Sequence, residues 1–113
     1  KLERGIDLVL EAVHFDERCC DAHLVLTGEG RLDSQSLQGK ACMGVTKAAA
    51  RRGVPTIAIV GSTGEGAANC VDPRRAGLLT RYVSLAERFG MPRALAEPAT
   101  LIELIAFELV CKT

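Results

Sequence analysis

Side chains capable of chemistry concentrate in the fourteen residues from Thr27 to Lys40 of this 113-residue chain. Two carboxylates, Glu29 and Asp33, alternate there with two cations, Arg31 and Lys40, and three glycines and three hydroxyls accompany them. The stretch directly follows a short apolar run of the kind that forms a buried strand. In open α/β sheets, ligands bind outside the carboxyl ends of the strands, so a binding site is expected here.

The residue types in this stretch suit a phosphate group. Gly28 and Gly30 allow the backbone to approach an anion closely, and the two cations can neutralise charge on a transferring phosphoryl group. The two carboxylates supply hard oxygen ligands for Mg²⁺, or one of them supplies a base for a substrate hydroxyl. This combination favours phosphoryl transfer, which depends mainly on positioning and charge neutralisation.

Two well-known nucleotide motifs do not fit. The run from Gly28 to Asp33 begins like a dinucleotide fingerprint but has Asp33 where the third glycine belongs. The ending Gly39-Lys40-Ala41 is similar to a P-loop, yet Ser34 stands at the first glycine and Ala41 replaces the hydroxyl that binds magnesium. A Rossmann cofactor site and a Walker motif are therefore not predicted.

A purely structural interpretation of the same residues stays open. Asp33 or Ser34 would then cap a helical turn, Glu29 and Arg31 would form a solvated ion pair, and Lys40 would be a surface charge.

The neighbouring segments predict a strand, a helix and a second strand. The strand from His23 to Leu26 precedes the stretch, a helix follows from Cys42 to Arg52, and the apolar run Thr56 to Val60 fits a strand buried on both faces. A βαβ unit with parallel strands results. The loop from Gly61 to Gly66 then lies at the same sheet edge, where Gly61 and Ser62 are candidate ligand-binding residues.

The rest of the chain predicts further short elements and a long last helix. We expect a helical piece at Ala67 to Val71, a short edge strand at Leu78 to Val83, a helical piece at Pro92 to Ala96 and a last helix, largely buried, from Pro98 to near Cys111. A helical stripe also begins the chain, at Ile6, Val9, Leu10 and Val13. Residues 1–113 are thus predicted to be a single α/β domain, a three-layer Rossmann/flavodoxin-like parallel sheet of about three strands flanked by helices.

Composition narrows the class of protein. Fourteen basic residues balance fourteen acidic ones, which argues against nucleic acid or anionic membranes as partners. No apolar run reaches the roughly 20 residues that span a bilayer, and a cytoplasmic location is expected. The five cysteines are scattered and odd in number, so we expect buried or half-buried free thiols, and His14 and His23 are expected to be structural.

The run from Leu24 to Asp33, together with Gly39-Lys40 and the run from Pro55 to Gly61, resembles the C-terminal part of the bacterial glycerate kinases. The resemblance implies a fragment of a longer two-domain α/β enzyme that phosphorylates D-glycerate with ATP and Mg²⁺. The implied partners are D-glycerate, ATP and the missing N-terminal part of the same polypeptide, and a second copy of the chain is kept as a further candidate. The isolated fragment is expected to be inactive.

The resemblance carries over to eight positions: Gly28, Glu29, Gly30, Arg31, Asp33, Gly39, Lys40 and Gly61. From their chemistry, the expected catalytic residues are Asp33, Lys40 and Arg31. Asp33 and Glu29 are the expected Mg²⁺ ligands, and the other positions, with Ser62, are expected to contact substrate or phosphate. Two other classes stay open, a nucleotide- or phosphate-binding module without catalysis and an interaction domain.

Overall fold

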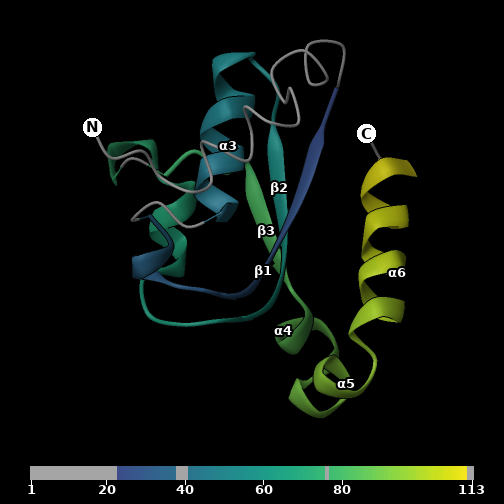
Figure 1. Ribbon diagram of the computed structural model, residues 1–113. Coiled ribbons are helices and arrows are strands. Elements are labelled where there is room, and N and C mark those ends of the chain that lie inside the picture. The colour runs from purple at the N-terminus through teal and green to yellow at the C-terminus, as the bar shows by residue number, and fades with distance from the viewer. Residues whose placement is uncertain (1–22, 38–40, 76, 112–113) are drawn as a thin grey trace.

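Three parallel strands form the sheet of the protein, in the order β1-β2-β3 (Figure 1). The computed structural model describes residues 23–37, 41–75 and 77–111. Strand β1 is Val25–Leu32, β2 is Thr56–Thr63 and β3 is Arg81–Ser84. Strand β2 is central and is buried on both faces from Thr56 to Val60, as its continuous apolar sequence predicts.

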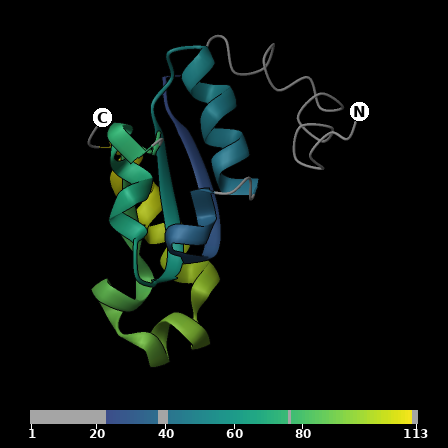
Figure 2. The same ribbon diagram turned by 90° about the vertical axis from the view of Figure 1, so that its left-hand side faces the viewer.

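Helices cover both faces of this sheet. Helix α3 (Ala41–Arg51) lies on one face and α6 (Pro98–Cys111) on the other, while α4 (Leu85–Phe89) and α5 (Met91–Ala96) lie beyond the end of the strands (Figures 1 and 2). Three 3-10 helices complete the described part: η1 (Ser34–Leu37), η2 (Ala67–Val71) and η3 (Pro73–Arg75). The predicted α/β class with three parallel strands is confirmed.

Each face of the sheet has its own apolar core. On the α3 face, buried side chains from β1, β2, α3 and η2 pack together: Leu32, Met43, Ala58, Val60, Ala67, Cys70 and Leu79. On the α6 face, Ile57 and Ile59 of β2 pack with Val83 and with side chains of α4, α5 and α6. Successive residues of β2 therefore point to opposite cores, which fixes the register of the central strand.

The first two strands are longer than the sequence predicts. Residues 27–32 belong to β1 and not to a loop, and Gly61, Ser62 and Thr63 belong to β2. Glycines and charges are poor strand formers, but the pairing of β1 with β2 continues through Arg31 opposite Ser62. Because the other side of β1 has no strand partner within the described residues, its charged side chains can reach solvent.

Most of the remaining elements lie where the sequence predicts them, but their first and last residues differ from the prediction. Helix α3 ends at Arg51, and Gly53 follows with φ 71°, the left-handed conformation that glycine adopts most readily. Strand β3 is a parallel edge strand but begins at Arg81, three residues later than predicted. Helix α4 was not predicted, although Ser84 followed by Glu87 is a capping-box sequence, and the Ser84 hydroxyl accepts from the Glu87 amide at 3.2 Å.

Helix α6 has the predicted bounds, but the prediction that it is largely buried was wrong. Leu101, Ile105 and Leu109 are buried against the sheet, at a spacing of four residues. The opposite side exposes further apolar side chains, with Phe107 69% exposed and Ile102 43% exposed. The helix has apolar side chains on most of its circumference, but the described residues cover only one side of it.

The two sides of α6 should respond differently to truncation. Ile105→Ala is expected to lower the free energy of unfolding by about 2–5 kcal/mol, since the side chain is fully buried. Ile102→Ala, which shortens the same side chain on the exposed side, should cost less than about 1 kcal/mol. Urea unfolding of the two variants measures the difference, and equal losses would contradict the orientation of the helix.

The predictions for the N-terminal apolar stripe, the histidines and the cysteines can be compared with the structure only where their residues are described. The apolar stripe from Ile6 to Val13, His14, Cys19 and Cys20 lie outside the described residues. Cys70 is a buried free thiol, as expected, whereas Cys111 is a free thiol but is exposed and not buried or half-buried as predicted; His23 is exposed. Within the described part of the chain, no helix combines the length and the apolar character needed to cross a membrane.

Candidate functional site

The end of β1 and the turn after β2 are joined by hydrogen bonds at the carboxyl edge of the sheet. The Gly64 amide donates to the Leu32 carbonyl at 2.8 Å, and the Ser34 amide donates to the Glu65 carbonyl at 3.0 Å. The end of β1 is therefore tied by backbone hydrogen bonds to the turn after β2. This confirms that the two segments share one edge, as the parallel sheet predicts.

Glycines let the two segments lie in direct contact. A Cβ atom on Gly61 would lie 2.7 Å from the Gly30 carbonyl oxygen, and one on Gly64 would lie 2.6 Å from the Arg31 guanidinium. Gly66 has φ 85° and packs against the Ser34 side chain, where a Cβ would also lie 2.6 Å away. The contact at Gly61 needs glycine for space, and Gly66 needs it for space and for backbone conformation, whereas the exposed Arg31 side chain could move away from a Cβ at position 64.

At the contact between Gly30 and Gly61, a Cβ atom would collide with the neighbouring strand only at position 61. The two alanine variants therefore form a matched pair. Gly61→Ala should lower the free energy of unfolding by about 1–3 kcal/mol, because the new methyl meets rigid backbone. Gly30→Ala should change it by no more than about 0.5 kcal/mol, since no atom lies within 4 Å of the added Cβ. Thermal or urea unfolding of both variants tests the contact, and equal destabilisation would contradict it.

Asp33 is held in one place by a reciprocal cap. Its Oδ1 accepts from the Gln35 amide at 2.9 Å, while its own amide donates to the Ser36 Oγ at 3.1 Å. Ser36 is fully buried beneath the turn of η1. The Ser36 bond is the one that the third residue makes in a capping box, while the Asp33 side chain caps the amide two residues on. The structural interpretation of Asp33 as a cap is thus correct, and it also leaves Oδ2 available.

That second oxygen faces a cation. Arg31 Nε lies 3.6 Å from Asp33 Oδ2, with the Asp33 side chain 22% exposed and the Arg31 side chain 64% exposed. An ion pair this open to solvent contributes little to stability. The guanidinium is therefore accessible to an anionic ligand. The alternative that Glu29 and Arg31 form the ion pair is not what the structure has, since Arg31 pairs with Asp33.

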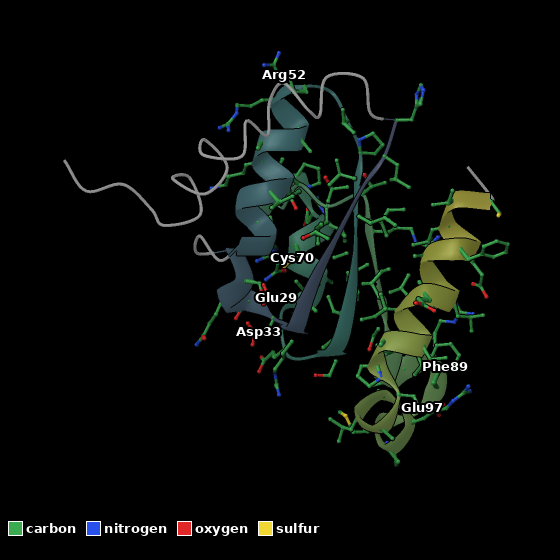
Figure 3. The ribbon with its side chains drawn as sticks, turned by 45° about the vertical axis from the view of Figure 1, so that its right-hand side comes forward. Glu29, Asp33, Arg52, Cys70, Phe89 and Glu97 are labelled. Atoms are coloured by element: carbon green, nitrogen blue, oxygen red, sulfur yellow. The ribbon has the colours of Figure 1, made fainter. Side chains whose placement is uncertain are left out.

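The burial of the Glu29 side chain is not explained by a contribution to the stability of the fold. Glu29 lies half-buried on β1, opposite Val60 of β2, and its Oε2 is buried with no hydrogen-bond partner among residues 23–37, 41–75 and 77–111. Val25, on the same side of the strand, packs against Ala49 of α3, so alternation points Glu29 to the α3 face. In the view of Figure 3, Glu29, Asp33 and Cys70 are all labelled toward the end of the sheet at which α3 begins. Withholding a partner from a buried carboxylate oxygen costs stability, which indicates a role other than folding.

Cys70 contacts the backbone of Asp33 from the buried side. It is buried, and its thiol donates to the Asp33 carbonyl at 3.7 Å. Burial, and secondarily the negative charge of Asp33, raise the pKa of this thiol above its ordinary value. The thiol therefore stays protonated at neutral pH and supports the backbone of Asp33, without acting as a nucleophile.

The structure places the other predicted site residues unevenly. Gly28 and Gly30 lie on β1 and are exposed, and Gly61 and Ser62 lie on β2 beside them. Gly39 and Lys40 fall outside the described residues. Among the residues that are described, no group of three or more His, Cys, Asp or Glu side chains is placed to hold a metal ion. Any Mg²⁺ here would take one or two carboxylates and complete its shell with phosphate oxygens and water.

Sequence reasoning missed the residues that position the acids. Ser36 holds the Asp33 amide, Cys70 supports its carbonyl, and Gly64 and Gly66 make room for the neighbouring segment. Only Ser36 had a signal, since Asp33 and Ser36 have the spacing of a capping box. Cys70 lies 37 residues from Asp33 in the chain, so nothing local could indicate the contact.

A parallel α/β sheet with two interlocked segments and two acids at its carboxyl edge is typical of a ligand-binding α/β domain. The comparisons give the family: the sequence profile of the glycerate kinase family matches residues 1–112, and the chain belongs to that family.

Individual relatives agree. Glycerate kinase of Bacillus subtilis (strain 168) is 59% identical over 61 residues, which cover 54% of this chain and 16% of that protein. Glycerate 2-kinase of Escherichia coli (strain K12) is 45% identical over 62 residues, 55% of this chain and 16% of that protein. A crystal structure assigned to glycerate kinase 2 of Salmonella typhimurium LT2 has a TM-score of 0.60 and 32% identity, covering 99% of this chain and 28% of that one. The chain thus spans less than a third of the relatives that it matches.

Proposed function

We propose that this chain supplies the C-terminal part of the active site of a kinase that transfers a phosphoryl group from ATP to a hydroxyl of D-glycerate. The family membership and the glycerate kinase names of its relatives support the reaction class. In this proposal the remaining part of the site comes from polypeptide outside the 113 residues, and the chain alone does not turn over.

The observation that carries the proposal is that Glu29 Oε2 has no hydrogen-bond partner among the described residues, while the turn after the same strand fixes the carboxylate of Asp33. One of the two acids accepts the proton of the substrate hydroxyl, because a base must lie within hydrogen-bond reach of the proton that it removes. The other contributes an oxygen to Mg²⁺, and Asp33 Oδ2 is suited to this since Oδ1 is occupied by the turn. Glu29 Oε2 and Asp33 Oδ2, the latter facing the exposed Arg31 at 3.6 Å, are therefore the oxygens assigned to the reaction.

The cations and glycines of the site would bind the anionic groups. Arg31, with its guanidinium largely exposed, and Lys40 are assigned to phosphoryl or carboxylate oxygens. The open backbone at Gly28 and Gly30 would let a phosphate come close. Gly61 and Ser62 of the neighbouring strand, with Gly39, are assigned to the same substrate or phosphate. Mg²⁺, when bound, would neutralise phosphate charge and orient the phosphoryl group for transfer.

The test is ³¹P NMR of the complete protein with D-glycerate, ATP and Mg²⁺. Appearance of phosphoglycerate with D-glycerate, and not with glycerol, supports the proposal, because glycerol lacks the carboxylate that a cation would bind. The isolated 113-residue chain, run beside it, should give no product. Phosphorylation of neither compound, with Mg-ATP still raising the melting temperature, would instead favour a nucleotide-binding module and overturn the kinase assignment.

A further inference from the structure

The guanidinium of Arg31 lies against the turn that follows β2. Its Nη2, Nε and Cζ atoms lie 2.6, 2.9 and 3.1 Å from the place that a Cβ atom on Gly64 would occupy. They are the three heavy atoms nearest to that place outside residues 63–65. The turn itself is held to β1, because the Gly64 amide donates to the Leu32 carbonyl at 2.8 Å. The absence of a side chain at Gly64 therefore leaves the space in which the guanidinium lies.

Asp33 faces the same guanidinium. Arg31 Nε lies 3.6 Å from Asp33 Oδ2, which is close enough for an ion pair and too long for a hydrogen bond. This pair therefore does not use an N–H donor of the guanidinium. The Arg31 side chain remains 64% exposed, so the guanidinium has neighbours on the protein and is still open to a ligand from solvent.

A guanidinium in this setting suits a carboxylate ligand. Its N–H groups form a rigid planar fork that can bind both oxygens of a carboxylate at once. A phosphate can be bound in the same manner, but in the proposed function Mg²⁺ neutralises the phosphates. The negative charge of Asp33 beside Arg31 also disfavours a second group of high negative charge. The single charge of a substrate carboxylate fits this pair better.

We propose that Arg31 binds the carboxylate of the substrate and that Gly64 is the positioning residue that leaves room for its guanidinium. The proposal rests on the proposed phosphorylation of D-glycerate, and it names the residue by which the enzyme selects a hydroxy acid over a neutral polyol. Arg31 lies opposite Ser62 of β2, near the carboxyl ends of both strands, where a ligand of a parallel sheet binds. A side chain placed before the substrate arrives loses less conformational freedom on binding.

Steady-state kinetics of the complete protein with D-glycerate, ATP and Mg²⁺ test the role of Arg31. Arg31→Met keeps an unbranched side chain but removes the charge, and it should raise the KM for D-glycerate about 10- to 100-fold. This is the effect expected for the loss of a hydrogen-bonded contact to a charged group. The KM for ATP should change by less than about threefold, because the phosphates are bound elsewhere. Arg31→Lys should recover little of the loss, since an ammonium lacks the planar fork.

Gly64→Ala tests the positioning role separately. Gly64 is not among the glycines with positive φ, so alanine fits this backbone, and the added methyl should displace the exposed Arg31 side chain. The KM for D-glycerate should rise about 3- to 10-fold, less than when the guanidinium is removed. Added to Arg31→Met, Gly64→Ala should cause no further rise, because no guanidinium is left to displace. A methyl that acts only through the fold would have the same effect in both backgrounds.

Different results would overturn the role of Arg31 and the proposed reaction. Turnover by the unmodified protein with an unchanged KM for D-glycerate in Arg31→Met, or with a raised KM for ATP in its place, would overturn the role of Arg31 and leave the reaction standing. A raised KM for D-glycerate in Lys40→Met but not in Arg31→Met would do the same, since Lys40 would then bind the carboxylate. Additive effects of Gly64→Ala and Arg31→Met would overturn the positioning role of Gly64. No turnover of D-glycerate by the unmodified protein would overturn the proposed function together with this inference.

Discussion

Replacing Glu29 by glutamine in the complete protein is expected to lower kcat by about 100-fold or more while the fold remains at least as stable. Loss of one transition-state contact has effects of this size. Stability should not fall, because Oε2 of Glu29 makes no hydrogen bond that the variant would lose. Removing a partly buried negative charge should instead leave the free energy of unfolding unchanged or raise it.

Glu65→Gln is the matched control for this variant. Glu65 lies at the same edge of the sheet and contributes its backbone carbonyl to the Ser34 amide, while its side chain is exposed. The Glu65→Gln variant removes one negative charge from the same edge of the sheet without changing a residue that is assigned to the reaction. Near-normal turnover in Glu29→Gln, or equal losses in both variants, would exclude a specific role for Glu29. Steady-state kinetics and urea unfolding provide the two readouts.

Asp33→Asn is expected to lower turnover to a similar degree, with a change in stability that Asp72→Asn reproduces. The two aspartates are close structural equivalents in the described chain. Oδ1 of Asp72 accepts from the Arg74 amide at 3.0 Å, as Oδ1 of Asp33 accepts from the Gln35 amide at 2.9 Å. Their side chains are 23% and 22% exposed, and each pairs with arginine.

This pair of variants separates capping from chemistry. Loss of the cap should cost both variants about 0.5–2 kcal/mol of stability. Only Asp33→Asn should lose turnover, because Asp72 lies between η2 and η3 and is given no part in the site. If both variants keep turnover, Asp33 is only a cap, and the structural interpretation of the central stretch is correct. Measured kcat values at a temperature well below both melting transitions decide this.

The sequence predicted the sheet well because its strongest signal is physical and local. Thr56 to Val60 is apolar without alternation, as a strand covered on both faces must be, and Gly53 ends α3 where a left-handed residue is needed. The lengths of β1 and β2 depend on pairing between distant residues, such as Arg31 with Ser62. Local propensity opposes that pairing, and so the end of β1 was predicted as a loop.

The same distinction applies to the candidate site. Charge and glycine content indicated the stretch, yet the support of Asp33 by Cys70 and the close contact of Gly61 with Gly30 arise only in the folded chain. Helix α6 was predicted to be largely buried because apolar residues cover most of its circumference, and its exposed Phe107 shows the limit of that argument. Composition indicates how much surface a helix could bury, but not what is available to cover it.

The most direct test is a crystal structure of the complete protein with Mg²⁺, a non-hydrolysable ATP analogue and D-glycerate. The proposal predicts that the phosphates lie at the carboxyl edge of β1 and β2. It also predicts that one acid, Glu29 or Asp33, contacts Mg²⁺ at about 2.1 Å and the other lies within about 3 Å of a glycerate hydroxyl. Phosphates and glycerate bound with neither acid in contact would contradict it, and the interlocked segments would then be a structural feature of the sheet.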